Sequence, residues 1–481
     1  MQKKFITNLA FLLFLNLLIK PFWILGIDRA VQNTVGAESY GLYAALFNLS
    51  FLFNILLDVG ITNYNNRNIA MHNHLLEKHL SGIIMLRLVL AIAYTIISLS
   101  IAFILGYQGA QIWMLSIMLV NQALISFILY LRSNIAGLQL FKLDSMISVL
   151  DRAVMIIICS FLIWGRAAGS EFKIEWFVWA QTLAYVITVA ITFFIVAKKA
   201  KLRKLQWNPT FFFIVLKHSY PFAILILLMT FYNRIDSVMI ERLLPNGAEQ
   251  AGIYAQSYRL LDASNMIAFL FSGLLLPMFS HMIKKKQPLQ ELAELSFSFI
   301  AIPAIALIGF CFFFSHDIMG LLYHSHVDAS SNLFKYVMCC FLAISSVYIF
   351  GTMLTANGNL KYLNIIALSG MTLNITLNLI LIPKFQALGA AYASLITQYT
   401  TAGLQIILAH KVFKFKFQKV LALKYLVYFG ATFYLFYTLS NYPSNWFLKG
   451  MIGCTISLLI ALGLKLIKPF ELVSLLKSEQ Q

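Results

Sequence analysis

The sequence predicts an all-α polytopic membrane protein with about fourteen transmembrane helices, in two six-helix lobes followed by two C-terminal helices. Three observations lead to this fold. Of the 481 residues, 60% are hydrophobic and only 11% are charged, against about 25% charged in a typical soluble domain. Apolar runs of about 20 residues, long enough to cross a membrane, recur along the whole chain. One nine-residue stretch occurs twice, as expected for two copies of one membrane unit.

The apolar runs divide the chain into three parts. Residues 1–205 are expected to form an N-terminal lobe, residues 206–410 a C-terminal lobe, and residues 411–481 two further helices and a cytoplasmic tail. The first run follows two lysines, as in a signal peptide, but no small-residue cleavage pattern follows it, so we interpret it as a span. The expected spans are 9–27, 40–62, 81–105, 110–131, 146–164, 174–197, 213–235, 251–279, 295–314, 333–356, 363–383, 388–410, 422–440 and 446–464.

Basic residues are concentrated in alternate loops. The loops on the N-terminal side of the membrane, with the tail, hold 22 of the 36 Lys and Arg residues, and the opposite loops hold 7. This asymmetry follows the positive-inside rule. We therefore predict a multi-pass membrane protein with both termini in the cytoplasm. Attraction to anionic headgroups explains the net charge of +18, so nucleic acid is not an expected partner. The five cysteines show no disulfide or metal pattern.

The repeated stretch reads GAESYGLYA at residues 36–44 and GAEQAGIYA at residues 247–255, with six of nine positions identical at an offset of 211. Both copies are expected in external loops, between spans one and two and between spans seven and eight. They therefore mark paired elbows at the outer mouth rather than the binding site itself.

Charged residues also lie at the outer ends of spans one and seven, as Asp28-Arg29 and as Arg234 and Asp236. We expect these residues to form an external gate that holds the two lobes together. Ordinary interfacial charges are the alternative interpretation.

Seven basic and three acidic residues lie within the expected spans. A charge inside the membrane costs a few kcal/mol and normally faces protein or a wet cavity. The surplus of cations therefore predicts an anionic ligand. These residues are Lys20, Arg87, Arg152, Lys217, Arg234, Arg259 and Lys424, with Asp58, Asp151 and Asp262.

Lys20 is the in-span charge closest to the expected midplane, about 16 Å into the first span. Pro21 follows it and should kink or break the helix. We expect Lys20 to face a central cavity, although snorkelling along a tilted helix is an alternative. Arg259 and Arg152 either face the same cavity or pair with neighbouring aspartates.

Three other in-span cations, Arg87, Lys217 and Lys424, lie within about two turns of the cytoplasmic side. We expect them to snorkel to the headgroup region.

Four groups of residues resemble motifs of polysaccharide or lipid-linked oligosaccharide flippases (Wzx type, O-antigen transporter-like) of the multidrug/oligosaccharidyl-lipid/polysaccharide exporter superfamily. Their order and spacing fit the expected topology. They are residues 36–44; Asp58-Val59-Gly60 with residues 67–70; residues 137–142 with residues 357–361; and Asn374, Asn378 and Pro383 with residues 389–391.

The resemblance implies a transporter of the bacterial cytoplasmic (inner) membrane in which two lobes rock around a central cavity. Its usual cargo is an oligosaccharide on undecaprenyl diphosphate, and Lys20, Arg259 and Arg152 are the candidates for binding the diphosphate. Relatives that flip the peptidoglycan precursor carry cavity arginines on the first, second and eighth helices. This chain has basic residues on the first and eighth spans but none within the second. That departure argues against the peptidoglycan precursor as cargo.

The resemblance further implies a protein that is not an enzyme and has no cofactor, with H+ or Na+ as candidate coupling ions. Expected partners are the lipid-linked oligosaccharide, membrane lipids and other polysaccharide-assembly proteins. The candidates for gating or coupling are Asp28, Arg29, Asp58, Arg234, Asp236 and Asp262.

Two other functions are considered. A multidrug exporter of the same superfamily would need buried carboxylates for organic cations, whereas the in-span balance favours cations. A membrane polysaccharide polymerase or ligase would need a large external loop with catalytic groups, whereas the expected loops are short.

Overall fold

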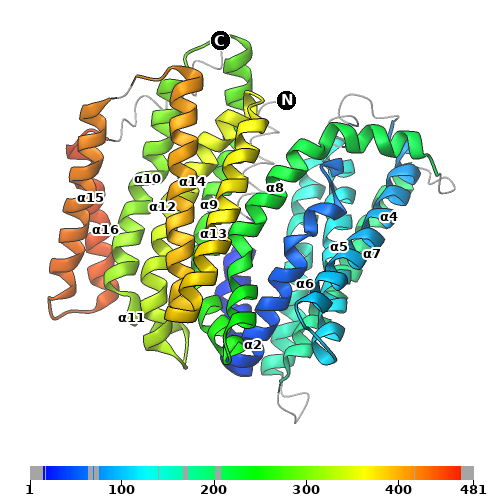
Figure 1. Cartoon of the computed structure of the whole chain (residues 1–481), viewed down its shortest axis with the longest axis horizontal. Helices are drawn as coiled ribbons and strands as arrows, with labels where there is room; N and C mark the ends of the chain where they lie inside the picture. Colours follow the sequence, from blue (N-terminus) through cyan, green and yellow to red (C-terminus); the bar gives the residue numbers. More distant parts are fainter. Residues whose placement is uncertain are drawn as a thin grey trace. The chain divides into compact units, whose positions relative to one another are not determined.

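The computed structural model of the chain describes residues 15–16, 18–62, 65, 69, 75–138, 140–165, 172–200, 207–416 and 418–466. In these ranges the regular structure is helical and contains no strand, which confirms the all-α prediction. The chain divides into two compact units, Met1–Gly252 and Ile253–Gln481 (Figure 1).

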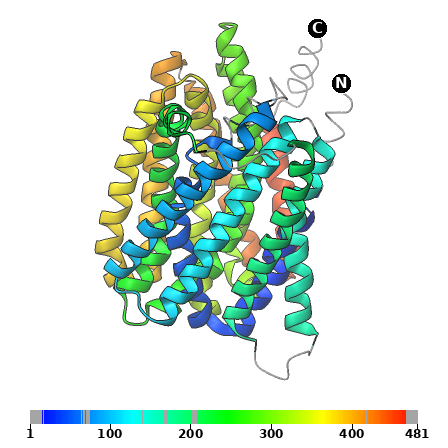
Figure 2. The ribbon, with the colours of Figure 1, turned by 90° about the vertical axis from the view of Figure 1, so that its right-hand side faces the viewer.

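Unit 1 contains the helices from the first span to the beginning of α9. Within it α5 packs against α7 and α2, and α2 packs against α8; Figure 2 shows these helices as long rods. Its elements are η1 (Trp23–Asp28), α2 (Arg29–Leu52), η2 (Asn54–Leu57), α4 (Leu75–Ile104), α5 (Ala110–Gly137), α6 (Phe141–Trp164), α7 (Ile174–Ala200), α8 (Pro209–Leu243) and the first residues of α9 (Gly247–Lys284).

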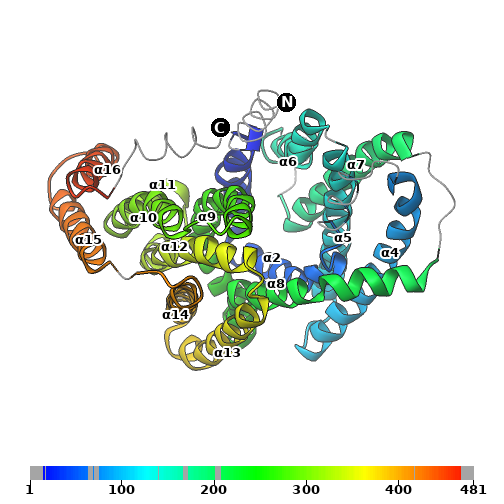
Figure 3. The same cartoon turned by 90° about the horizontal axis from the view of Figure 1, so that it is seen from above.

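Unit 2 contains the rest of α9 and the helices that follow it. Helix α12 packs against α10 and α14, α14 packs against α13, and α15 and α16 pack against each other and against α10 (Figure 3). Its other elements are α10 (Gln290–Phe313), α11 (Ser315–Leu322), α12 (Val327–Ala356), α13 (Leu360–Phe385), α14 (Ala387–Phe413), α15 (Lys419–Ser440) and α16 (Trp446–Gly463).

Every expected span coincides with helical structure, although the predicted start of the first span lies outside the described residues. Ten helices in the described ranges are long and apolar enough to cross a membrane. Helices α2, α9 and α14 have 24, 38 and 27 residues, which also exceeds the roughly 20 needed for a span. Helix α11 was not predicted from the sequence.

The first span keeps a helical backbone at Pro21 and then widens into the π-helix η1, which begins at Trp23. A proline removes one backbone donor and clashes with the preceding turn, and a π-helical turn is one way to absorb this disturbance without ending the helix. The expected kink or break at Pro21 therefore takes the form of a locally widened helix.

Candidate functional site

Lys20 and Arg152 lie close together in unit 1. Lys20, beside Pro21, interacts electrostatically with Arg152, Asp151 and Arg132. Among the described residues, Lys20 has no hydrogen bond or ion pair. Two of the three predicted diphosphate-binding residues thus belong to one cluster, although they come from segments about 130 positions apart in the sequence.

Among the described residues, the guanidinium of Arg152 makes no short contact with an oxygen atom. Its Nε lies 3.8 Å from an Asp151 carboxylate oxygen, and its Nη1 lies 3.3 Å from the Met155 sulfur and 3.5 Å from the Tyr185 hydroxyl. Normal hydrogen bonds from nitrogen to oxygen are about 2.7–3.2 Å long. An arginine carries five N–H donors, so Arg152 keeps most of its donor capacity available. Its side chain is 29% exposed.

The π-helix positions an aromatic ring at this cluster. The Arg152 guanidinium carbon lies 5.3 Å from the centre of the Trp23 ring, within the range of a cation–π contact. Trp23 in turn stacks on Phe177 of α7 with ring centres 5.8 Å apart. The local widening after Pro21 therefore fixes both the lysine and the aromatic neighbour of Arg152 on one short segment.

Arg132, another arginine of unit 1, is paired with a carboxylate. Arg132 donates from Nε and Nη2 to the two carboxylate oxygens of Asp144, at 2.8 and 3.2 Å. This two-point geometry is the strong form of an arginine–carboxylate pair. Arg132 is therefore neutralised in place, whereas Arg152 is not.

Arg87 is buried rather than snorkelling, which corrects the expectation for this residue. Its side chain is 6% exposed and forms an ion pair with Asp58. It also donates to the Ser126 carbonyl and hydroxyl oxygens, both at 2.9 Å, and to Thr62 Oγ1 at 2.8 Å. A buried guanidinium needs such partners because an unpaired charge in an apolar setting is costly. By contrast, Lys217 is exposed as expected.

Asp58 also shapes the turn that ends the second span. Its carboxylate accepts the backbone N–H groups of Gly60 and Thr62, each at 3.1 Å. Gly60 has φ +84°, a left-handed conformation that glycine adopts without strain. The motif Asp58-Val59-Gly60 thus has a structural explanation, and a gating or coupling role for Asp58 stays a prediction.

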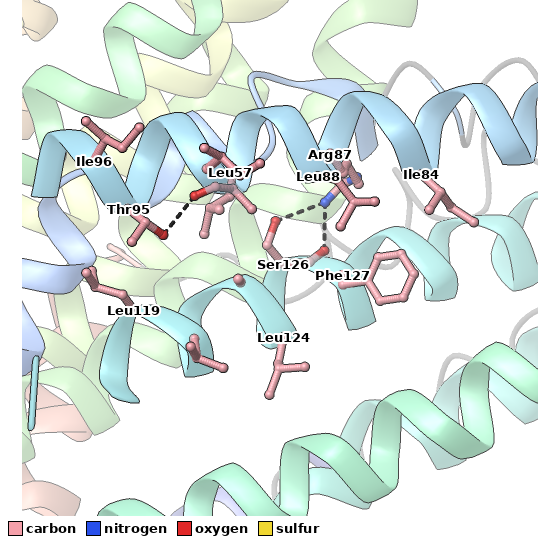
Figure 4. A pocket seen from close by; sticks show the side chains of 14 residues that line it. Leu57, Ile84, Arg87, Leu88, Thr95, Ile96, Leu119, Leu124, Ser126 and Phe127 are labelled. Carbon is pink, nitrogen blue, oxygen red and sulfur yellow. Dashed lines mark hydrogen bonds between the residues drawn. The ribbon is translucent and has the colours of Figure 1, made fainter. Parts of the chain in front are cut away.

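A groove of about 490 Å³ between α4 and α5 begins beside Arg87 (Figure 4). Figure 4 shows Arg87 turned toward Ser126, with mainly apolar side chains along the rest of the groove. Leu88, Ile92 and Val120 on its walls are about half exposed. Because Arg87 is already paired, the groove is an apolar surface and not an anion site.

The Asp58–Arg87 pair could have been found from the sequence. In the expected antiparallel pair of spans, Asp58 lies four residues before the end of span two and Arg87 six residues after the start of span three. At about 1.5 Å per residue both fall at a similar depth. Opposite in-span charges at matched depths on neighbouring spans are the signal that we missed.

Arg259, the third predicted diphosphate-binding residue, lies on α9 in unit 2. Its Nη1 is 4.0 Å from an Asp262 carboxylate oxygen three positions along the helix. That distance is longer than a hydrogen bond, so the pairing is a loose one. The side chains of Arg259 and Asp262 are 22% and 20% exposed.

Asp28, one of the predicted gate residues at the end of the first span, is a buried carboxylate. Asp28 is 3% exposed and accepts a bifurcated hydrogen bond from the Tyr40 hydroxyl, at 2.8 and 2.9 Å from its two oxygens. Arg29 is adjacent and half-buried. Asp28 is therefore not an ordinary interfacial charge, because it is held inside the bundle by a residue of the repeated motif.

The corresponding pair on α8 behaves similarly. Asp236 is 1% exposed, and the Arg234 guanidinium carbon lies 5.6 Å from the centre of the Phe51 ring of α2. A carboxylate is therefore buried near the end of the first span and near the end of the seventh span.

The two copies of the repeated motif pack directly against each other. A Cβ atom on Gly41 would lie 1.8 Å from the Ala248 carbonyl oxygen, and a Cβ atom on Gly252 would lie 2.0 Å from the Ala37 carbonyl oxygen. Ala248 and Gly252 are the 211-offset counterparts of Ala37 and Gly41. The contact is thus reciprocal, and glycine is required at both positions because no side chain fits.

A second contact joins the loop between α4 and α5 to α8. Tyr107, in the loop between α4 and α5, donates a 2.7 Å hydrogen bond to Glu241 of α8. The Arg242 guanidinium carbon lies 3.7 Å from the centre of the Tyr107 ring. Burial raises the pKa of Tyr107 above its ordinary value, and the neighbouring Glu241 raises it further. The phenol therefore stays a donor throughout the physiological pH range.

Comparisons with known proteins agree with the motif resemblance. The family model described as "Polysaccharide biosynthesis protein" matches residues 8–283. No curated protein sequence matches the chain significantly.

Solved structures share the fold at low sequence identity. The lipid II flippase MurJ in an inward closed conformation has a TM-score of 0.70 and 16% identity, with 96% of this chain and 98% of that chain covered. A multidrug resistance MATE family transporter of the MOP superfamily, in an inward-facing conformation, has a TM-score of 0.64 and 14% identity, with 81% and 94% covered. A MOP superfamily transporter from Pyrococcus furiosus has a TM-score of 0.55 and 13% identity, with 85% and 93% covered.

These structural likenesses establish a multi-pass, all-helical transporter fold, as the apolar runs of the sequence predict. The family model covers more than half of the 481 residues. The chain therefore belongs to the polysaccharide biosynthesis protein family and has the fold of the MOP-superfamily transporters.

Proposed function

We propose that this protein flips an undecaprenyl-diphosphate-linked oligosaccharide from the inner to the outer leaflet of the bacterial cytoplasmic membrane, for the synthesis of a surface polysaccharide such as O-antigen, capsule or exopolysaccharide. Membership of the polysaccharide biosynthesis family and the fold shared with a lipid II flippase support this proposal. The two lobes, residues 1–205 and 206–410, would move against each other, and both termini would lie in the cytoplasm.

The observation that carries the proposal is the open donor capacity of Arg152 beside Lys20. Structural arginines and lysines inside a membrane protein are normally paired, as Arg87 and Arg132 are here. Lys20 and Arg152 share one aspartate, Asp151, which Arg152 approaches only to 3.8 Å. Two cations against one carboxylate leave a local excess of positive charge.

A diphosphate suits this excess. Its oxygens accept several hydrogen bonds, and a guanidinium binds phosphate oxygens with two donors at once. Attraction between opposite charges is several-fold stronger in a protein interior than in bulk water. The cluster would therefore lower the cost of drawing the charged headgroup of the carrier lipid away from the membrane surface. Arg259 would add a third cation from the second lobe.

The gate follows from the repeated motif. The Gly41–Ala248 and Gly252–Ala37 contacts close one end of unit 1, and the charge pattern of the loops assigns this end to the outside. Asp28, Arg29, Arg234 and Asp236 lie beside the motif in sequence, and Asp262 and Asp58 complete the set of gate or coupling candidates. Opening of this end would release the cargo to the outer leaflet.

Transport by Lys20→Ala and Arg152→Ala variants tests the proposal. Each variant should lower the rate of flipping of a lipid-linked oligosaccharide in proteoliposomes by about tenfold or more, because each removes a charged hydrogen-bond donor. Lys20→Arg should retain most of the activity. Lys217→Ala, which removes an exposed cation, is the matched control. Full transport by both alanine variants at normal membrane levels would overturn the proposed site.

A multidrug exporter is the competing function, because the MATE transporters share the fold and Asp28 and Asp236 are buried carboxylates of the kind that an organic cation needs. The Tyr40 hydroxyl already occupies both oxygens of Asp28, which makes it less available to a cation. Deletion of the gene should therefore leave resistance to cationic drugs unchanged while surface polysaccharide is lost. The reverse pattern would favour export of drugs.

A further inference from the structure

A polar cleft of about 390 Å³ opens in unit 2 where α10 and α15 begin and α16 ends. Its apolar lining residues include Leu295, Leu421 and Leu466. Its charged lining residues balance each other, with two acids and two lysines. They are Glu291, Glu294, Lys424 and Lys465.

The lysines in this cleft are not neutralised by its acids. Among the described residues, neither Lys424 nor Lys465 forms an ion pair or a hydrogen bond through its side chain. Glu294 is instead occupied by amides, because Gln290 donates to it at 2.6 Å and Gln418 donates to its two oxygens at 2.9 and 3.0 Å. The carboxylate is thus fixed in place while the ammonium groups remain available.

A second hydrogen-bonded pair fixes the inner wall. The Ser298 and Tyr425 hydroxyls lie 2.7 Å apart, and Tyr425 packs edge-on against Phe297 with ring centres 5.3 Å apart. In addition, Gln290 bonds to both the carbonyl and the N–H of the Lys416 backbone, at 2.9 and 3.1 Å. The cleft is therefore built on fixed side chains and is not a loose gap between helices.

The depth of the cleft matches the headgroup region of a leaflet. It lies at the first turns of α10 and α15 and just beyond the last turn of α16, at the end that the charge pattern assigns to the cytoplasm. Lysine and arginine side chains in pockets between helices on the cytoplasmic side bind the phosphate groups of lipid headgroups. Lys424 is expected to snorkel to the headgroup region, and the structure places it in the lining of this cleft.

We propose that this cleft binds the headgroup of phosphatidylethanolamine, with the phosphate at Lys424 and Lys465 and the ammonium at Glu291. The balanced charge of the lining complements a net-neutral headgroup that carries both signs, rather than a net anion. A primary ammonium donates three hydrogen bonds, which a carboxylate accepts, whereas the quaternary ammonium of phosphatidylcholine donates none. The leucines of the lining would contact the first carbons of the acyl chains. This inference does not depend on the proposed transport activity.

Native mass spectrometry of the purified full chain tests the assignment. The protein is exchanged into equimolar phosphatidylethanolamine, phosphatidylcholine and phosphatidylglycerol, and the retained lipid is quantified. The wild type should retain phosphatidylethanolamine over phosphatidylcholine by about fivefold or more. Lys424→Met and Lys465→Met should each weaken retention about fivefold, the effect of one basic residue at a membrane surface. Glu291→Gln should reduce the preference over phosphatidylcholine.

Lys419→Met is the matched control, because Lys419 begins the same helix and is exposed but does not line the cleft. Its lipid retention should equal that of the wild type. Unchanged retention in the Lys424→Met/Lys465→Met double variant would overturn the proposal, as would equal retention of phosphatidylcholine or a preference for phosphatidylglycerol. Displacement of the lipid by soluble phosphoethanolamine at millimolar concentration would also overturn it, because the site would then bind a free phosphate ester.

Discussion

Arginines in unit 1 show two opposite uses of one side chain. Arg87 is enclosed by Asp58, Thr62 and Ser126, so its charge supports the fold. Arg152 makes only contacts of 3.3 Å or longer, so its charge remains available to a ligand. The two arginines, with side chains 6% and 29% exposed, therefore differ both in their partners and in their exposure.

The Arg87 pair gives a prediction on stability. Arg87→Leu leaves the Asp58 carboxylate, whose side chain is 24% exposed, without its charged partner. Removal of one member of a fully buried ion pair costs about 3–5 kcal/mol, so the partial exposure of Asp58 places the expected loss near the lower end of that range. The midpoint of thermal unfolding in detergent should fall accordingly. The double variant Asp58→Leu/Arg87→Leu removes both charges and should recover part of the loss.

Lys217→Leu serves as the control for that experiment, because this in-span cation is exposed and its replacement should change the midpoint little. If Arg87→Leu were as stable as the wild type, the ion pair would not contribute to the fold.

Some residues of the candidate site could be predicted from the sequence. Lys20 and Arg152 could be selected because charges in apolar spans are rare and need a reason. The hydrogen bonds from Tyr40 to Asp28 could not be predicted from the sequence, because they depend on how the chain turns at Gly36, whose φ is +80°. The distance between Arg152 and Asp151 could not be predicted either, because adjacent residues on a helix point about 100° apart and their rotamers depend on neighbours such as Trp23.

Among the elements, α2 and the beginning of α9 depend on a backbone contact that no side chain can enter. Gly41→Ala would place a methyl group 1.8 Å from the Ala248 carbonyl oxygen, so the helices must separate. Overpacking of this kind costs about 1–3 kcal/mol. We expect a lower midpoint of thermal unfolding for Gly41→Ala and for Gly252→Ala.

Gly403→Ala is the matched control for these substitutions. Gly403 lies inside α14, and a Cβ atom there would have no neighbour within 4 Å. Since alanine favours a helix over glycine by about 1 kcal/mol, this variant should be as stable as the wild type or slightly more stable. Equal stability of all three variants would contradict the close packing of the motif.

The sequence predicted the existence and type of the elements better than their internal irregularities. Long apolar runs located the helices because a span must satisfy its backbone internally. The π-helix at Trp23–Asp28 and the 3-10 turn at Asn54–Leu57 have no such signal. They depend on how a local disturbance, such as Pro21, is absorbed by the surrounding packing.

For the whole molecule, the charge pattern predicts an orientation that can be measured. Green fluorescent protein fused at the C-terminus should fluoresce, because the C-terminus is predicted to lie in the cytoplasm. Alkaline phosphatase inserted in the loop between α11 and α12, after residue 325, should be active because that loop is predicted to be external. Phosphatase inserted after residue 286, between α9 and α10, should be inactive and is the internal control. The opposite pattern would invert the proposed direction of transport.

The glycine contact also bears on how a chain of this kind can arise. Each copy of the motif supplies the same two groups, an alanine carbonyl and a glycine, to the other copy. Exchange of identical groups across a two-fold relation is the pattern of an isologous interface between identical subunits. A protein with one copy of the motif could make this contact only with a second molecule of itself. Fusion of two such copies would convert a dimer interface into an intramolecular one, in which neither glycine can change without affecting the other half.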